Sequence, residues 1–205
     1  YYSTVDSFTG SRSVASGLTQ VASVPTVPAQ SGTLLTVYTG TDVMFTVTGS
    51  PGEYGTPTPY SYWYRPLLPG TVITNNVDQS VPVNASLRRW CLGWTATTNA
   101  VVFTNGVTTQ AVFTLPAVAT LQTWLWTNQY YLTVSAGVGG TASVAAAGWY
   151  TNAATVQVSA TATGSYAFAQ WSGDVPFLDR TNNPLTVTMD QARSLQATFV
   201  DTVTQ

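Results

Sequence analysis

The sequence contains no lysine and no histidine, and these two absences exclude much of the chemistry that enzymes use. Without histidine, the usual general base and the Ser–His triads are missing, and without lysine there is no Schiff-base chemistry. A carboxylate pair for glycoside hydrolysis would have to come from the eight acidic residues. We therefore expect that the protein is not an enzyme and that it uses no cofactor.

The acidic residues also offer little for a metal site. Only Asp174 and Asp179 stand close together, beside Gly173, Pro176 and two asparagines, all of which are typical of turns. We interpret this segment as a turn, with a weak Ca²⁺ site as the alternative. One cysteine and no histidine exclude the usual zinc and iron sites.

Charge of either sign is scarce. Charged residues make up 7% of the chain, against about 25% in ordinary soluble proteins, and the net charge is −2. Weak self-repulsion favours association, as in a subunit of an assembly; adaptation to an acidic, salty or hot medium is the alternative. The six arginines are scattered apart from Arg88 and Arg89, so we expect no nucleic-acid partner.

Long apolar runs are also missing. No stretch approaches the roughly 20 residues of a membrane-spanning helix, so we expect no membrane span. No signal peptide is visible, and the chain opens on Tyr1 and Tyr2 without methionine. We interpret the sequence as a processed mature form or a fragment.

The only cysteine, Cys91, cannot form an intrachain disulfide. It stands between Trp90 and Trp94, which predicts a small buried hydrophobic residue. An intermolecular bridge is the alternative.

What the sequence does contain is alternation of apolar and polar residues with period two. It is clearest in residues 155–162, 166–171, 184–189 and 194–199, with a turn at residues 172–174. This is the pattern of half-buried strands. No stretch has a convincing helical period, and residues 191–193 offer one turn at most. The sequence therefore predicts an all-β fold.

Several motifs in the carboxyl-terminal third occur in a recognisable order. They are Tyr131–Val134, Gly139–Gly140, Gly148–Tyr150, Trp171–Asp174, Asn183–Asp190 and Ala197–Phe199. This stretch resembles the bacterial repeat domain related to the internalin B-repeat, the Listeria–Bacteroides repeat group. The resemblance implies a small β-rich module of secreted and surface proteins, a structural or adhesive spacer without catalytic residues. It also implies an extracellular or cell-surface location, to which the low charge and the abundant threonine and valine point as well. One departure is Ala153–Ala154, where the family often has a glycine turn.

Residues 42–128 read as a diverged copy of the module at residues 129–205, which ends in a short tail. The matching segments keep their order: Phe45–Thr48 with Leu132–Ser135, Trp63–Tyr64 with Trp149–Tyr150, Gly70–Thr71 with Ala154–Thr155, Gly93–Thr95 with Gln170–Ser172, Val112–Leu115 with Leu185–Thr188, and Leu125–Trp126 with Thr198–Phe199. Kept order with changed loop lengths is typical of tandem repeats. Residues 126–134 join the copies almost without a linker, which predicts a stiff pair.

Residues 1–41 do not resemble a domain. Apolar residues recur every three positions, among Pro25 and Pro28, at Leu18, Val21, Val24 and Val27. This spacing suits an extended path and excludes a helix. The segment is a linker, a set of strands that completes the next domain, or an arm that adds a strand to a neighbouring subunit.

Aromatic residues are the best candidates for binding. Because Trp63/Trp149 and Trp94/Trp171 occur in both copies, we expect those four in the core. Tyr60 and Tyr62 lack partners in the second copy, so we predict an exposed patch there that can stack on sugar rings. Core or subunit contact is the alternative for this patch.

Residues Asn84–Ser86 form a glycosylation acceptor pattern, with Asn84 as the acceptor. Without lysine, no lysine–asparagine isopeptide bond can lock the modules, so stability has to come from packing, hydrogen bonds or assembly.

Low charge, missing catalytic groups, the arm and the repeats together favour a structural subunit of an extracellular or cell-surface assembly. Such a subunit would self-associate into a homopolymer, a filament, by strand addition from the arm. The alternative function is a carbohydrate-binding or adhesive module of a larger surface protein, with a polysaccharide as partner.

Overall fold

The computed structural model describes residues 2–5, 12–14, 34–37, 41–144 and 148–203. This part of the chain contains 17 strands, one short 3-10 turn and no α-helix, which confirms the predicted all-β class. Among these residues there is also no helix with the length and apolar character to cross a bilayer. The predicted assembly arm residues Leu18, Val21, Val24 and Val27 lie outside the described residues.

Three short strands precede the main body: β1 (Tyr2–Val5), β2 (Arg12–Val14) and β3 (Leu34–Val37). They form a small antiparallel sheet in the order β2-β1-β3.

The first half of the main body holds seven strands and the start of an eighth. They are β4 (Val43–Ser50), β5 (Trp63–Leu67), β6 (Val72–Asn76), β7 (Ser80–Asn84), β8 (Leu87–Thr98), β9 (Val101–Gly106), β10 (Gln110–Thr114) and β11 (Thr120–Ala136). The second half contains β12 (Gly140–Val144), β13 (Gly148–Thr151), β14 (Thr155–Ala162), β15 (Tyr166–Gly173), the 3-10 turn η1 (Phe177–Asp179), β16 (Leu185–Thr188) and β17 (Arg193–Asp201).

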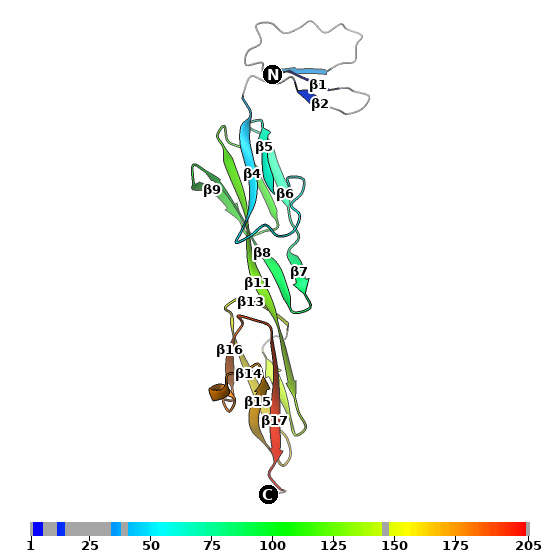
Figure 1. Ribbon diagram of the computed structural model, residues 1–205, viewed down its shortest axis with the longest axis vertical. Coiled ribbons are helices and arrows are strands. Elements are labelled where there is room, and N and C mark those ends of the chain that lie inside the picture. Colours follow the sequence, from blue (N-terminus) through cyan, green and yellow to red (C-terminus); the bar gives the residue numbers. More distant parts are fainter. Residues whose placement is uncertain (1, 6–11, 15–33, 38–40, 145–147, 204–205) are drawn as a thin grey trace.

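The strand β11 is the axis of the molecule. It has 17 residues, and at about 3.3 Å per residue it extends roughly 55 Å. Its first part pairs with β4 and β8, and its last part pairs with β13 and β17. Figure 1 shows the resulting rod, with β11 running from one half into the other. The join that the sequence predicts to lack a linker is therefore one continuous strand.

Two separate hydrophobic clusters lie along this strand. The first cluster contains Phe45, Ile73, Trp94, Phe113 and Trp124 among its buried residues. The second contains Leu132, Trp171, Leu185, Met189 and Leu195. Alternate residues of β11 contribute to both clusters, because Trp124 and Trp126 belong to the first cluster and Leu132 belongs to the second. Burial of such clusters, at roughly 25 cal/mol per Å² of apolar area, provides the main stabilisation of each half.

The strand pairing of the first half reappears in the second. A parallel pair, β4 with β11, corresponds to β11 with β17. Three antiparallel pairs also correspond: β5–β4 with β13–β11, β6–β10 with β14–β16, and β8–β11 with β15–β17. The strand β11 thus ends the first set of pairings and begins the second.

Matched hydrogen bonds support this correspondence. The indole Nε1 of Trp94 donates to the carbonyl of Gln110 at 2.9 Å, and that of Trp171 donates to the carbonyl of Asn182 at 3.0 Å. Both rings are buried, which confirms the predicted core positions of Trp94 and Trp171.

The register corrects part of the predicted alignment. Gly70 N–H donates to the carbonyl of Leu115, and Ala153 N–H donates to that of Met189, so Gly70 corresponds to Ala153. The predicted match of Gly70–Thr71 with Ala154–Thr155 is therefore wrong by one residue, as is that of Val112–Leu115 with Leu185–Thr188. Ala153 has φ of +66°, the left-handed conformation that glycine adopts at no steric cost.

Candidate functional site

The predicted patch residues Tyr60 and Tyr62 lie half-buried against the first cluster. The ring of Tyr60 meets that of Phe45 edge-on at 5.5 Å. Its backbone N–H donates to Oδ1 of buried Asn75 at 3.0 Å, and its carbonyl accepts from Nδ2 of the same residue at 2.9 Å. These contacts position the chain that leads into β5.

The hydroxyl of Tyr62 donates to the backbone carbonyl of Tyr54 at 2.5 Å. Burial raises the pKa of Tyr62 to about 12, because the charged phenolate is poorly solvated there. Both tyrosines thus hold the segment before β5 onto the core, with their rings half-buried against it.

The exposed aromatic pair is instead Trp63 and Tyr64, at 66% and 55% exposure. The predicted core position of Trp63 is therefore wrong. Trp63 pairs with Val47, whereas Trp149 pairs with Tyr131, so the two tryptophans do not occupy equivalent positions. Trp149 itself is only half-buried. We call Trp63 and Tyr64 the edge aromatic pair.

The edge aromatic pair forms a flat platform. Its rings stack at a centroid separation of 5.3 Å and an interplanar angle of 18°. Their strand, β5, pairs only with β4 in the described part of the chain, so the rings stand at a sheet edge. Such a platform offers apolar area together with polar N–H and O–H tips.

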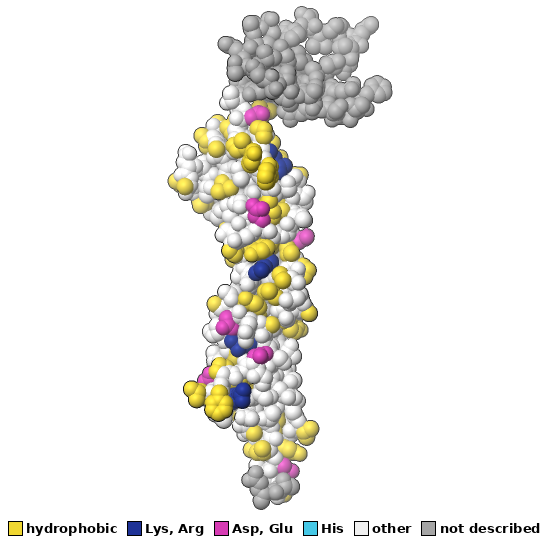
Figure 2. Space-filling model, in the orientation of Figure 1, with side chains coloured by type: hydrophobic (Ala, Val, Ile, Leu, Met, Phe, Trp, Pro, Cys, Tyr) yellow, Lys and Arg dark blue, Asp and Glu magenta, His cyan; other side chains and the backbone are white. Residues whose placement is uncertain are grey.

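An uncharged sheet face extends from this edge. Tyr64 begins a row of register partners that crosses the sheet from strand to strand. The next members of this row are Thr46, Leu121, Thr97 and Val102. Residues Met44, Thr46, Thr97 and Leu121 also line a shallow hollow of about 260 Å³ on this face. Figure 2 shows how sparse charged side chains are over the described part of the visible face.

The two halves meet at a cluster of stacked side chains. The guanidinium of Arg88 lies 4.7 Å from the ring of Trp90 and 4.6 Å from that of Trp149, so it sits against both aromatic side chains. Its Nε donates to Oε1 of Gln129 at 2.8 Å. Because Trp149 belongs to β13, this arginine joins the first half to the second.

Arg89 makes a second set of contacts at the same level. Its guanidinium lies 4.6 Å from the ring of Tyr54 and donates to Oδ1 of Asn128. The amide of Asn128 in turn donates to the hydroxyl of Tyr130 at 3.0 Å. The paired arginines are therefore structural contacts of the junction.

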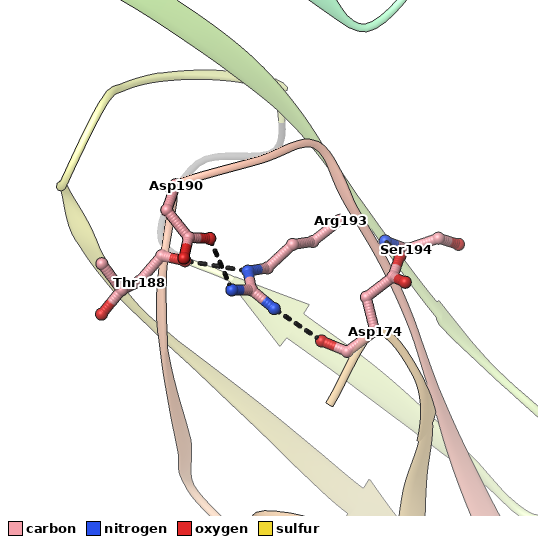
Figure 3. Close-up of polar contacts among 5 residues, drawn as sticks. All are labelled: Asp174, Thr188, Asp190, Arg193 and Ser194. Atoms are coloured by element: carbon pink, nitrogen blue, oxygen red, sulfur yellow. Dashed lines mark hydrogen bonds and ion pairs between the residues drawn. The ribbon is translucent and has the colours of Figure 1, made fainter. Parts of the chain in front are cut away.

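The acidic turn of the second half is tied to β17 (Figure 3). Arg193 donates from Nε to the carbonyl of Thr188 at 2.8 Å, from Nη1 to the carbonyl of Asp174 at 2.9 Å, and from Nη2 to Oδ1 of Asp190 at 2.7 Å. The Asp174 carboxylate accepts the backbone N–H of Ser194 at 2.8 Å. This network fixes the turns that flank β17.

The carboxylates considered for Ca²⁺ do not converge in this network. Asp179 stands in η1, accepts from Nδ2 of Asn182 at 3.1 Å, and is not among the partners of the Arg193 guanidinium. Within the described ranges, no group of three or more acidic, histidine or cysteine side chains is arranged to hold a metal ion. The local bonds agree with the turn interpretation of Asp174 and Asp179.

Cys91 is 3% exposed, as its aromatic surroundings predict. Burial raises the pKa of its thiol, which disfavours the reactive thiolate. Asn84, the acceptor of the glycosylation pattern, is exposed at the end of β7, and its Oδ1 accepts the backbone N–H of Ser86 at 2.9 Å.

Comparison with known proteins finds a match for the second half of the rod. Residues 130–202 match the family model described as the divergent InlB B-repeat domain, and no catalytic family is found. No curated protein and no solved structure matches the chain. The carboxyl-terminal part of the chain, residues 130–202, is thus a divergent InlB B-repeat domain, a module typical of bacterial surface proteins.

Proposed function

We propose that this chain is a structural subunit of an extracellular or cell-surface assembly, in which two repeat modules form one stiff rod. The observation that carries the proposal is β11, a single 17-residue strand that pairs within both halves. Bending the rod at its junction would require breaking backbone hydrogen bonds of this strand, together with the Arg88 and Arg89 contacts. A flexible linker would impose no such cost.

Residues 42–128 are, in this proposal, a diverged second copy of the repeat. The support is the equivalent strand pairing of the two halves and the matched indole bonds of Trp94 and Trp171. The hydrogen-bonded pairs at Gly70/Leu115 and Ala153/Met189 add to it. The two halves differ between their matched strands: the first carries the β8–β9 hairpin where the second carries η1, and β7 and β12 have no counterpart.

Assembly into a homopolymer, a filament, occurs by strand addition from the amino-terminal segment. The support is the sequence of residues 13–41, which contains no charged residue and is rich in valine, serine and threonine. A strand added to an open sheet edge gains main-chain hydrogen bonds along its whole length. The low overall charge leaves little repulsion between subunits.

Negative-stain electron microscopy tests this proposal. The full chain is compared with a variant that lacks residues 1–30, at matched concentrations. We expect filaments from the full chain and isolated rods from the variant. Isolated rods from the full chain at high concentration would contradict the structural-subunit proposal.

A carbohydrate-binding or adhesive module is the second candidate function, and the edge aromatic pair favours it. Stacked, exposed rings beside an uncharged hydroxyl-lined face suit a neutral sugar chain. The test is a glycan array followed by binding isotherms for any glycan retained. We expect Trp63→Ala to weaken binding at least tenfold, equivalent to about 1.4 kcal/mol.

Phe177→Ala is the matched control, because Phe177 is also an exposed aromatic residue, at 79% exposure, but lies outside the edge aromatic pair. Both variants should keep the wild-type unfolding midpoint. An array without any retained glycan, or equal loss in the two variants, would exclude this function for the pair.

A further inference from the structure

The strand β9 is an open edge with an apolar surface. Within the described part of the chain it pairs with β8 alone. Val101, Val102 and Phe103 are 67%, 49% and 41% exposed, and Val107, just beyond the strand, is 88% exposed. Figure 1 shows β9 on the outside of the first half of the rod. Its free backbone groups are therefore accessible from the side.

Three other edge strands of the rod carry features that discourage pairing, whereas β12, β13 and β15 lack such features but expose no large apolar side chain, and β6 and β10 expose one valine each. The strand β5 contains Arg65 and Pro66, and β7 contains Pro82. The strand β16 has four residues and follows directly on Pro184. Charges, prolines and short length are the usual means of protecting an edge. By contrast, β9 has six residues, no proline and no charge, and it exposes three large apolar side chains, Val101, Val102 and Phe103.

One protective feature is present in β9, and it leaves most of the apolar surface in place. The register with β8 shifts so that Ala96 faces Thr104 and Thr97 faces Val102, which makes Phe103 a bulge. The Phe103 ring then meets Phe113 of β10 edge-on at 5.8 Å. Val112 of β10 is also exposed, at 50%, but it alternates with Phe113 and so points away from the Phe103 contact.

We propose that β9 is the acceptor edge for strand addition, and that its occupant is residues 18–24 of a second copy of this chain. This inference rests on the proposed assembly function and names its contact surface. Residues 18–24 lie outside the described part of the chain. They are free of proline and charge, so pairing with β9 would bury no unpaired charge.

The dimensions and side chains of the two segments also agree. Seven extended residues span about 23 Å, which covers the roughly 20 Å of the six residues of β9. In an extended strand, Leu18, Ala22 and Val24 share one face and Val21 lies on the other. Either face therefore brings an apolar side chain toward the valines of β9.

Disulfide trapping tests the contact directly in the full chain. One preparation carries Val21→Cys, a second carries Val102→Cys, and the two are mixed under assembly conditions and oxidised. We expect a covalent dimer of the two variants on a non-reducing gel. Cys91 stays in both chains, since its burial keeps it out of the reaction.

The matched control replaces Val102→Cys with Thr186→Cys, an exposed position on β16, which is a short edge strand that follows Pro184. We expect at least tenfold less dimer with this control. Equal trapping at both positions, or trapping at Thr186→Cys alone, would overturn the assignment of β9.

A second variant tests whether the edge is needed for assembly. Val101→Lys places a charge on the exposed end of β9, and we expect the critical concentration for assembly to rise about tenfold. Thr186→Lys should leave it unchanged. Normal assembly of the Val101→Lys variant together with absent trapping would refute β9 as acceptor and leave the structural-subunit proposal standing. Absence of assembly in the wild-type chain would instead refute both the acceptor role of β9 and the structural-subunit proposal.

Discussion

Tyr62 shows how one side chain can couple stability to pH. Its pKa is about 12 in the folded protein and about 10 in the unfolded chain. Between these values the unfolded state loses the proton first, so the free energy of unfolding falls as pH rises. The stabilising effect of the neutral hydroxyl is fully present below pH 10 and is lost as pH rises through 12.

The variant Tyr62→Phe tests this coupling. Near neutral pH it should be less stable by about 1 kcal/mol, because the hydrogen bond to the Tyr54 carbonyl is lost. As pH rises above 10, the difference from wild type should shrink, since phenylalanine has no proton to lose. Urea unfolding at pH 7, 9, 10 and 11 measures the difference. A constant difference across this range would contradict the prediction.

At the scale of elements, the junction depends on Arg88. Its guanidinium contacts Trp90 and Trp149 and donates to Gln129, three contacts that only a planar group can make together. Burial lowers the pKa of Arg88 through loss of hydration. The two cation–π contacts, each of order 0.5–2 kcal/mol, offset that loss.

Arg88→Lys should therefore destabilise the protein by about 1–2 kcal/mol, although the charge is kept. Denaturant unfolding followed by tryptophan fluorescence measures the change. The control is Arg180→Lys, because Arg180 lies 5.6 Å from the exposed ring of Phe177 and makes no contact between the halves. Equal effects of the two changes would show that Arg88 has no special role at the junction.

The alternation of apolar and polar residues was sufficient to predict strands β14 to β17, and the recurrence of Trp94 and Trp171 in both halves predicted their buried positions. The short join at residues 126–134 between the matched segments predicted the missing linker. These features are local in sequence or repeat in both halves, so a single chain reveals them.

The exposure of Trp63 could not be predicted in the same way. Periodicity shows which side of a strand a residue takes, but it does not show whether another strand lies beyond. Because β5 is a sheet edge, the ring of Trp63 is exposed to solvent, although the sequence predicted it to be in the core. Pro66 in β5 was a usable signal, because proline is confined to edge strands. The Arg88 contacts join residues 61 positions apart, and no local pattern indicates them.

At the scale of the whole molecule, a shared strand makes the two halves of the rod one mechanical unit. Each half has its own hydrophobic cluster, so each could keep its packing if the junction were loosened. The stiffness of the rod then depends on β11 and on the arginine contacts beside it. The stability of each half therefore has a different origin from the alignment of the halves. Stability and alignment can be tested independently.

Insertion of Gly-Ser-Gly-Ser between Asn128 and Gln129 should interrupt β11 without disturbing either cluster. A four-residue flexible segment lets the halves adopt many angles, because the backbone pairing no longer continues from one to the other. Small-angle X-ray scattering at concentrations below assembly should show a shorter mean longest dimension and a broader distance distribution. The same insertion between Asn99 and Ala100, at the exposed β8–β9 turn, should preserve the profile of the rod. If both insertions preserve the profile of the rod, the junction is held by the side chains of Arg88, Arg89 and Trp149 rather than by the strand. In that case, combining the insertion after Asn128 with Arg88→Lys should make the junction flexible.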